Sequence, residues 1–310
     1  MIPADIGFSS LLKNEELCLT IAEAISYKHG IQLNGQRITG GSNLLYLLSP
    51  GRVLKLFSKD EKAFRDNEAL FLKNLSGKLP VRTPVLYNTG EFQGYPYIIM
   101  GQAEGTPLSE LWTDLDEAAK LKLTTSMGKL LKAMHTLPKD LAEGCVPEWS
   151  TFMEGQLTDY EKHHRDYGLN PEETEQVGEF LRRGPAIEKT EKNVICHTEL
   201  MPEHLFVEYE NGEPVLSALI DFEPSMLAVP QYDFAAVGIF ITRGNKNLYE
   251  SFLEAYQPEF HPKSSHIMRM LLLHRYCYLN WFMDFIPNRP DKLDLDALAD
   301  FWYGTTASGL

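Results

Sequence analysis

Two histidines and two carboxylate residues with the spacing of a catalytic site lie within residues 194–221, VICHTELMPEHLFVEYENGEPVLSALID. They are His197, Glu199, His204 and Asp221. The pattern predicts a strand, a polar loop, a second strand, an Asn-Gly turn and a third strand. His197 and Glu199 begin the loop, His204 ends it, and Asp221 ends the last strand, so we expect all four side chains at one end of a hairpin. Burying such a cluster is costly in free energy unless a metal ion and phosphate groups bind there.

The same spacing occurs in the catalytic loop of kinases, where His-x-Asp-x-x-x-x-Asn is followed by Asp-Phe-Gly. In this chain Glu199 stands at the place of the loop aspartate and His204 at the place of the asparagine, and Asp221 is followed by Phe and then Glu223. A glutamate can still act as a carboxylate base, and a histidine can still bind a metal ion. The pattern is therefore kinase-like, with changes at positions that perform chemistry.

Upstream residues could bind a nucleotide. Gly41 and Ser42 belong to a turn between two strand-like runs, where glycines would let backbone amides approach phosphates. Lys55 is the only charged residue in the apolar run Val53–Phe57 and would need a partner if buried, for which Glu68 on the next predicted helix is the candidate. Kinases use such a pair to hold the α- and β-phosphates. Each feature also has a purely structural explanation: the glycine turn could be an ordinary hairpin, Lys55 could point to water from an edge strand, and Glu68 could be exposed. The order of these residues along the chain, with the 197–221 cluster downstream, favours the nucleotide site.

The formal net charge of the 310 residues is −14. No basic stripe is available to neutralise phosphates, which argues against nucleic acid as a partner. An acidic protein can attract cationic small molecules, although solubility alone explains the charge equally well. The four cysteines are scattered without a CxxC pair, as in reduced cytosolic proteins. No signal peptide is recognisable and no apolar run approaches about 20 residues, so we expect a cytoplasmic protein without a membrane span.

Hydrophobic periodicity predicts an α+β, bilobal architecture. Strands are expected within 36–57, 85–90 and 95–100, and helices over 15–29, 61–75, 116–136, 148–167, 172–183, 232–256 and 264–285. We therefore divide the chain into a β-rich nucleotide-binding lobe (1–100), a hinge (101–106, GQAEGT) and a helix-rich lobe for catalysis and acceptor binding (107–310).

Taken together, these motifs resemble the aminoglycoside phosphotransferase family, small-molecule kinases with a protein-kinase-like fold, over about residues 36–285. The motifs that carry the resemblance are VLKLF, NEALFLKNL, YPYIIMGQAEGTPL, MGKLLKAMHTLP, CHTELMPEHLFVE, and ALIDFE followed by VPQYDFAAVG. Within the family, EKHHRDYG and the tail WFMDFIPNRPDKLDLDALADFWYG most resemble hygromycin-B 7''-O-phosphotransferase. A histidine at the His204 position also resembles the gentamicin 2''-phosphotransferase branch.

The resemblance implies an enzyme that uses ATP or GTP with Mg²⁺ to phosphorylate a hydroxyl of a small, cationic molecule such as an aminoglycoside, and that is a monomer. It also implies a role for individual residues. The implied nucleotide-binding residues are Lys55, Glu68, Gly41, Ser42, Gln102 and Ala103. The implied metal ligands are His204 and Asp221. Glu199 would be the catalytic base and touch the acceptor, and His197 would support catalysis by orienting the loop.

Acidic residues are concentrated where this family binds its acceptor. Residues 148–182 contain nine acidic residues and three basic ones, which could pair with ammonium groups of a polyamine sugar, although a solvated helix face explains most of them. Asp284 is the candidate that we single out as a substrate contact. It follows an aromatic run (Tyr276, Tyr278, Trp281, Phe282) that should be partly buried, so we expect its charge to have a partner.

Two other functions have to be weighed. The residues at four positions would also suit a degenerate kinase homologue that binds nucleotide or ligand without efficient turnover: Glu199, His204, Glu223 and Pro224. A protein kinase is disfavoured, because no Ala-Pro-Glu landmark of an activation segment follows Asp221.

Overall fold

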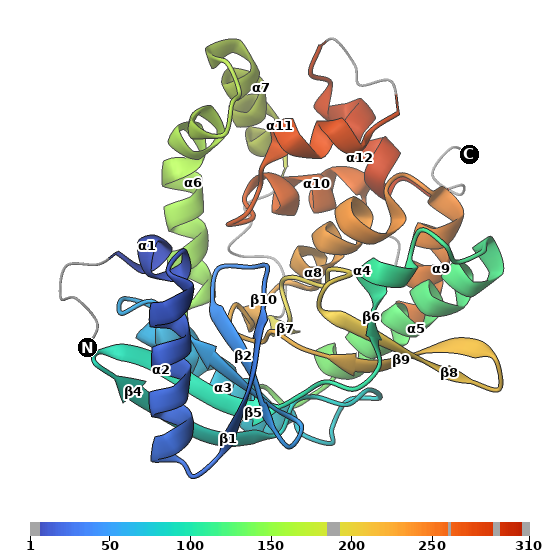
Figure 1. Cartoon of the computed structure of the whole chain (residues 1–310). Coiled ribbons are helices and arrows are strands. Elements are labelled where there is room, and N and C mark those ends of the chain that lie inside the picture. Colours follow the sequence, from blue (N-terminus) through green and yellow to red (C-terminus); the bar gives the residue numbers. More distant parts are fainter. Residues whose placement is uncertain (1–6, 185–192, 260–261, 288–291, 306–310) are drawn as a thin grey trace.

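The computed structural model describes residues 7–184, 193–259, 262–287 and 292–305. Its N-terminal part is a five-stranded antiparallel sheet in the order β1-β2-β3-β5-β4 (Figure 1). The strands are β1 (Gln32–Ile38), β2 (Leu44–Ser49), β3 (Arg52–Leu56), β4 (Leu86–Phe92) and β5 (Tyr95–Gly101). The predicted strands are confirmed, and β3 is a central strand rather than an edge.

Helices cover both faces of this sheet. On one face, α1 (Phe8–Leu12) and α2 (Glu15–Lys28) share a buried core with alternate residues of β3, including Leu54 and Leu56. On the other face, α3 (Lys62–Leu75) packs against Val53 and Phe57. Because side chains alternate along a strand, Lys55 must point to the α3 face. The alternation within VLKLF therefore determines which helix can supply a partner for the lysine.

The C-terminal part is mainly helical, so the predicted α+β class is confirmed. Its longer helices are α5 (Glu117–His135), α6 (Trp149–Asp166), α7 (Pro171–Arg182), α9 (Lys246–Tyr256), α10 (Ser264–Leu272) and α12 (Leu295–Tyr303). Shorter helices are α4 (Leu108–Leu111), α8 (Pro230–Ala236) and α11 (Leu279–Phe282). At the contact between α5 and α9, a Cβ on Gly128 would lie 2.2 Å from the carbonyl oxygen of Phe252, so only glycine permits this approach.

Two small sheets carry the loop that the sequence singled out. Strands β8 (Leu205–Glu210) and β9 (Glu213–Leu219) form the predicted hairpin, to which β6 (Thr106–Pro107) adds a third strand. The expected first strand, β7 (Val194–Cys196), does not join this hairpin. It pairs instead with β10 (Met226–Ala228), beyond Asp221. The polar loop therefore crosses from one small sheet to the other, and its two ends are held independently.

Two of the predicted helices are broken. The helix expected over 232–256 ends in a π-helical turn (Val237–Thr242) and a left-handed residue, Arg243, before Asn245 caps α9. The helix expected over 264–285 ends at Leu272. Beyond it the chain forms α11 and a 3₁₀ turn (Met283–Phe285).

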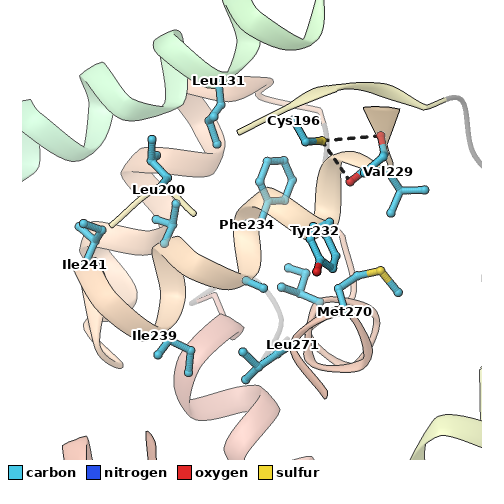
Figure 2. Close-up of a cluster of buried hydrophobic side chains, with 14 of the residues drawn as sticks. Leu131, Cys196, Leu200, Val229, Tyr232, Phe234, Ile239, Ile241, Met270 and Leu271 are labelled. Atoms are coloured by element: carbon cyan, nitrogen blue, oxygen red, sulfur yellow. Dashed lines mark hydrogen bonds between the residues drawn. The ribbon is translucent and has the colours of Figure 1, made fainter. Parts of the chain in front are cut away.

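The buried core of the helical part surrounds α8. Tyr232 and Phe234 of this helix lie among apolar side chains that include Leu131, Leu200 and Met270 (Figure 2). The thiol of Cys196 donates to backbone carbonyls at the start of α8. This helix is therefore rigidly placed next to the polar loop. All four cysteines are free thiols.

The segment 101–106, expected to be a hinge, connects β5 to β6. A second link joins the two parts, because the backbone of Arg82 pairs with Ser217 and Leu219 of β9. None of the helices in the described ranges combines the length and apolarity that a membrane crossing requires.

Candidate active site

Lys55 and Glu68 form a buried ion pair. The lysine Nζ lies 2.8 Å from Glu68 Oε2, and the two side chains are 5% and 0% exposed. Burial raises the pKa of Glu68 to about 7, against the opposing pull of Lys55. A buried pair of this kind gives weak net stabilisation, because desolvation offsets most of the Coulomb energy, so its position calls for a functional explanation.

Two carboxylates from the C-terminal part of the chain, Asp221 and Glu223, complete the surroundings of Lys55. Asp221 Oδ1 lies 2.6 Å from Nζ and Glu223 Oε2 lies 2.8 Å from it. Burial alone would lower the pKa of Lys55, but the carboxylates raise it well above its usual value. Burial also opposes ionisation of Asp221, yet Lys55 and His204 hold its pKa well below the ordinary range. The sequence predicted Asp221 near Lys55 but did not predict Glu223 there.

His204 bridges Asp221 and the polar loop. Its Nδ1 donates to the carbonyl oxygen of Glu199 at 2.8 Å, and its Nε2 lies 3.1 Å from Asp221 Oδ2. Burial opposes a charge on this imidazole, but Asp221 outweighs burial and raises the pKa of His204 to about 9. At neutral pH the ring is therefore an imidazolium that donates from both nitrogens. In that form it orients the two carboxylate residues rather than offering a lone pair.

Glu199 carries a carboxylate oxygen that is buried without a hydrogen-bond partner among the described residues. Burial raises the pKa of this group to about 7. A carboxylate with a pKa near neutrality can accept a proton efficiently at physiological pH. The unpaired oxygen is also the kind of atom that a substrate hydroxyl or a metal ion would satisfy.

The backbone of the loop is strained just before Glu199. Thr198 has φ +74°, in the left-handed region that non-glycine residues rarely occupy. The preceding His197 is fully buried, and its Nε2 donates to the carbonyl of Ile220 at 2.9 Å. Burial lowers the pKa of His197 to about 4, so this ring is neutral and acts as a positioning group. It does not touch Lys55.

Asp233 holds the strained loop, and sequence reasoning missed this role. From α8, its buried carboxylate accepts the backbone N–H groups of His197, at 3.1 Å, and of Thr198. The same carboxylate pairs with His135 Nε2 of α5 at 2.8 Å. His274 Nε2 donates to the carbonyl of Thr198 at 3.0 Å. The run Tyr232-Asp233-Phe234-Ala235 was visible as a family motif, but no local signal links it to residues 197–198.

Comparison with known proteins identifies this arrangement. Residues 35–266 match the sequence profile described as phosphotransferase enzyme family. The chain belongs to this family. The match spans nearly all of the sheet, the polar loop and the helices up to the start of α10, so it includes every residue of the site described above except His274.

Solved structures of aminoglycoside and macrolide phosphotransferases share the fold. The GDP and kanamycin complex of APH(2")-IIia is 16% identical, with a TM-score of 0.69 over 86% of this chain and 96% of that chain. The streptomycin-ATP-APH(2")-IIa ternary complex is 18% identical, with a TM-score of 0.57 over 79% and 86% of the two chains. Macrolide 2'-phosphotransferase MphH from Brachybacterium faecium is 16% identical, with a TM-score of 0.59 over 87% and 98%.

At these identities the structures establish the fold alone, and the kinase-like fold predicted from the sequence is confirmed. No curated protein matches the chain significantly in sequence. The narrower resemblance to hygromycin-B phosphotransferase stays a prediction.

The predicted nucleotide contacts outside Lys55 and Glu68 lie in exposed segments. Gly41 has φ +78°, and a Cβ there would meet nothing within 4 Å. With Ser42 it forms an open turn, which is tied to the site through Asn43, whose side chain donates to Glu223 Oε2 at 3.0 Å. The backbone N–H of Gln102 already donates to the carbonyl of Gly51. A nucleotide base would therefore have to bind other groups of this segment, including Ala103.

The sequence predicts a partner for the charge of Asp284, and this residue does interact with another residue, although its side chain is exposed. It lies in the 3₁₀ turn after α11, next to the buried Met283, and Phe282 of the same aromatic run is also buried. Trp281 and Tyr276 are 49% and 40% exposed, so the run is only partly covered. The role of Asp284 as a substrate contact stays a prediction.

The oxygen-rich donor set suits a hard cation. The carboxylate oxygens of Glu68, Asp221 and Glu223 include atoms within 4.8 Å of one another, and so do the ligand atoms of Glu199, His204 and Asp221. Carboxylates near substrate phosphates are the usual ligands of Mg²⁺. The residues present therefore fit the magnesium ion that the family implies.

Proposed function

We propose that this protein is a small-molecule kinase that transfers the terminal phosphoryl group of ATP or GTP to a hydroxyl of a cationic acceptor such as an aminoglycoside. The observation that carries the proposal is Lys55, held by Glu68 from α3 and by Asp221 from the end of β9 in a member of the phosphotransferase family. Residues 1–100 would then form the nucleotide lobe, 101–106 the hinge and 107–310 the acceptor lobe.

Each residue has a defined part in the reaction. Lys55 would bind phosphate oxygens of the nucleotide, and Glu68 would keep its ammonium group in place. Asp221 would hold Mg²⁺, which neutralises phosphate charge. Glu199 would accept the proton of the acceptor hydroxyl while that oxygen forms its bond to the γ-phosphorus and the bond to the β-phosphate oxygen breaks. His204 and His197 would fix the position of Glu199.

Three observations favour a cationic acceptor. The chain carries a net charge of −14, and α6 and α7 are rich in exposed acids. Structures of similar fold include complexes with kanamycin and with streptomycin. Hygromycin B is the first compound to test, because the tail and the EKHHRDYG segment resemble its kinase; residues 288–291 of that tail lie outside the described residues.

The test is nucleotide consumption with a panel of aminoglycosides, macrolides and neutral polyols. Asp221→Ala should abolish Mg²⁺-dependent turnover while the circular dichroism spectrum and melting temperature stay close to those of the wild type. Absence of turnover with every acceptor would contradict the proposal. If Asp221→Ala unfolds the protein, Asp221 is a structural residue.

A second candidate function is binding without efficient turnover. It is favoured by the His204–Asp221 ion pair, which engages a nitrogen that would otherwise face a metal ion. Restoring the kinase residues with Glu199→Asp and His204→Asn separates the two functions. Higher turnover in the double variant would mean that the present residues are degenerate, and lower turnover would mean that the site is adapted to them.

A further inference from the structure

Glu223 places a third carboxylate on Lys55. Its Oε2 lies 2.8 Å from Nζ, at the same distance as Glu68 Oε2, and Asp221 Oδ1 lies 2.6 Å away. A single ammonium group cannot neutralise three carboxylates, so when all are ionised the cluster has excess negative charge. Phosphates could approach such a cluster only together with cations. Lys55 already has Glu68 as its partner, so charge pairing with Lys55 does not explain the presence of Glu223.

We propose that Glu223 is a ligand of the divalent metal ion and binds it together with Asp221. This inference rests on the proposed function and assigns the metal a second protein oxygen. Both residues contribute to the group of carboxylate oxygens that lie within 4.8 Å of one another. One or two carboxylates plus substrate phosphates is the ligand set that Mg²⁺ commonly takes.

Accessibility distinguishes Glu223 from the other nearby carboxylate. The Glu68 side chain is 0% exposed and lies behind Lys55, whereas the side chains of Glu223 and Asp221 are 15% and 25% exposed. An ion arriving with the nucleotide can therefore reach Asp221 and Glu223 without displacing the buried pair.

The geometry of His204 also favours Glu223. Both ring nitrogens of His204 already have oxygen partners, Nδ1 the carbonyl of Glu199 and Nε2 the carboxylate of Asp221. Imidazole is in addition a softer ligand than carboxylate, and Mg²⁺ prefers oxygen. The second protein ligand predicted from the sequence at position 204 is better supplied by Glu223.

Anchors on both its side chain and backbone hold Glu223 in place. Asn43, at the end of the β1–β2 turn, donates to its carboxylate at 3.0 Å. Asn67 of α3 donates to its carbonyl at 2.8 Å, and Arg275 donates to the carbonyl of the next residue, Pro224, at 3.1 Å. A metal ligand must be held in a fixed position by its surroundings, and these contacts do so. They also place the ligand beside the turn expected to cover the phosphates.

The test measures Mn²⁺, used as a probe for Mg²⁺, by electron paramagnetic resonance of the full-length protein with ADP. Glu223→Gln keeps the size of the side chain and an oxygen for Asn43 but removes the charge. We expect the affinity for Mn²⁺ in the presence of ADP to fall at least about tenfold, within the range seen when a ligand environment is damaged. Glu223→Asp keeps the oxygen donors and should fall less. The matched control is Glu203→Gln, an exposed glutamate of the polar loop between β7 and β8 with the same charge change.

A counter-ion for Lys55 is the competing role of Glu223. In that case Glu223→Gln lowers the melting temperature, but Mn²⁺ affinity stays within about twofold of Glu203→Gln, and the metal-ligand proposal is overturned. If Glu223→Gln does not fold, the comparison of wild type with Glu223→Asp decides: equal Mn²⁺ affinities overturn the proposal. If the wild type binds neither ADP nor Mn²⁺, the proposed function fails first, and this inference fails with it.

Discussion

Replacement of Asp233 by asparagine should weaken the hold on the loop that carries Glu199 without changing any residue expected to contact the substrate. The Asp233 carboxylate is fully buried on α8 and touches no residue of the Lys55 cluster. It accepts hydrogen bonds from the backbone amides of His197 and Thr198 and pairs with His135. Asp233→Asn preserves the shape of the side chain, but it exchanges one acceptor oxygen for a donor.

The structure sets the size of the effect. An imidazole can present either a donor or an acceptor nitrogen, so His135 can adapt to the new amide, whereas the backbone N–H groups cannot. One buried N–H is then left unpaired, at a cost of about 1–3 kcal/mol. Thr198 is held at φ +74°, a conformation that costs about 1–2 kcal/mol in wild type and variant alike, so it does not add to the difference. We therefore expect the free energy of unfolding to fall by about 1–3 kcal/mol. Because Glu199 follows Thr198 directly, turnover should fall at least about tenfold.

Urea unfolding followed by tryptophan fluorescence measures the first quantity, and the phosphotransfer assay at a temperature where the variant is folded measures the second. Cys196→Ala is the matched control. Its thiol donates to the carbonyls of Ala228 and Val229 and also contacts His135 Nε2, at 3.9 Å, and Asp233. It bonds neither of the loop amides that Asp233 holds. The control should lose about 1 kcal/mol of stability and no turnover. If Asp233→Asn loses less than about 1 kcal/mol and keeps its turnover, Asp233 does not hold the loop.

Three further outcomes are expected. Burial lowers the pKa of His164 to about 4 in the folded protein, where its Nε2 donates to the carbonyl of Leu272. The unfolded chain, with a pKa of about 6.5 for this histidine, takes up a proton between pH 7 and 4.5, whereas the folded protein largely does not. The free energy of unfolding should therefore fall by about 2–3 kcal/mol over this range. His164→Leu should remove that share of the pH dependence in urea titrations at the two pH values, and an unchanged slope would refute the assignment. Gly128→Ala should destabilise by about 3 kcal/mol, measured in the same way, because its Cβ would collide with backbone at Phe252. The KM for a cationic acceptor should rise with ionic strength while kcat changes little, and Asp284→Asn should raise KM likewise; a KM indifferent to both would refute the cationic acceptor.

The part of the site that follows from local pattern was predictable. A lone lysine in an apolar strand has to point to one face of the sheet, and the next helix covers one face, so the approach of Glu68 to Lys55 could be expected. The loop spacing likewise predicted Asp221 at the end of the third strand, and Asp221 follows the last residue of β9 by two residues. Both predictions depend on residues close in sequence or on one motif.

The remaining contacts are non-local, and the sequence contains no rule for them. Asp233 lies 35 residues after Thr198, and their contact depends on how α8 packs in the core. The side chain of Glu223 reaches Asn43 across 180 residues. The break near residue 243 was different, because Arg243-Gly244-Asn245 is a readable stop and cap signal that helical periodicity outweighed.

Two of the three altered positions of the site, His204 and Glu223, compensate each other in charge, and Glu199 keeps the charge of the aspartate it replaces. His204, with a pKa of about 9, adds a positive charge beside Asp221 where the kinase pattern has a neutral asparagine. Glu223 adds a negative charge beside Lys55 where the pattern has glycine. The net formal charge around Lys55 and Asp221 is therefore the same as in the kinase pattern. Random loss of function would not be expected to balance two charges in contact with one ion pair. This balance favours an adapted site over a degenerate one. His204→Asn alone would leave the negative charge of Glu223 uncompensated. We therefore expect this single variant to have lower turnover than the wild type in the phosphotransfer assay.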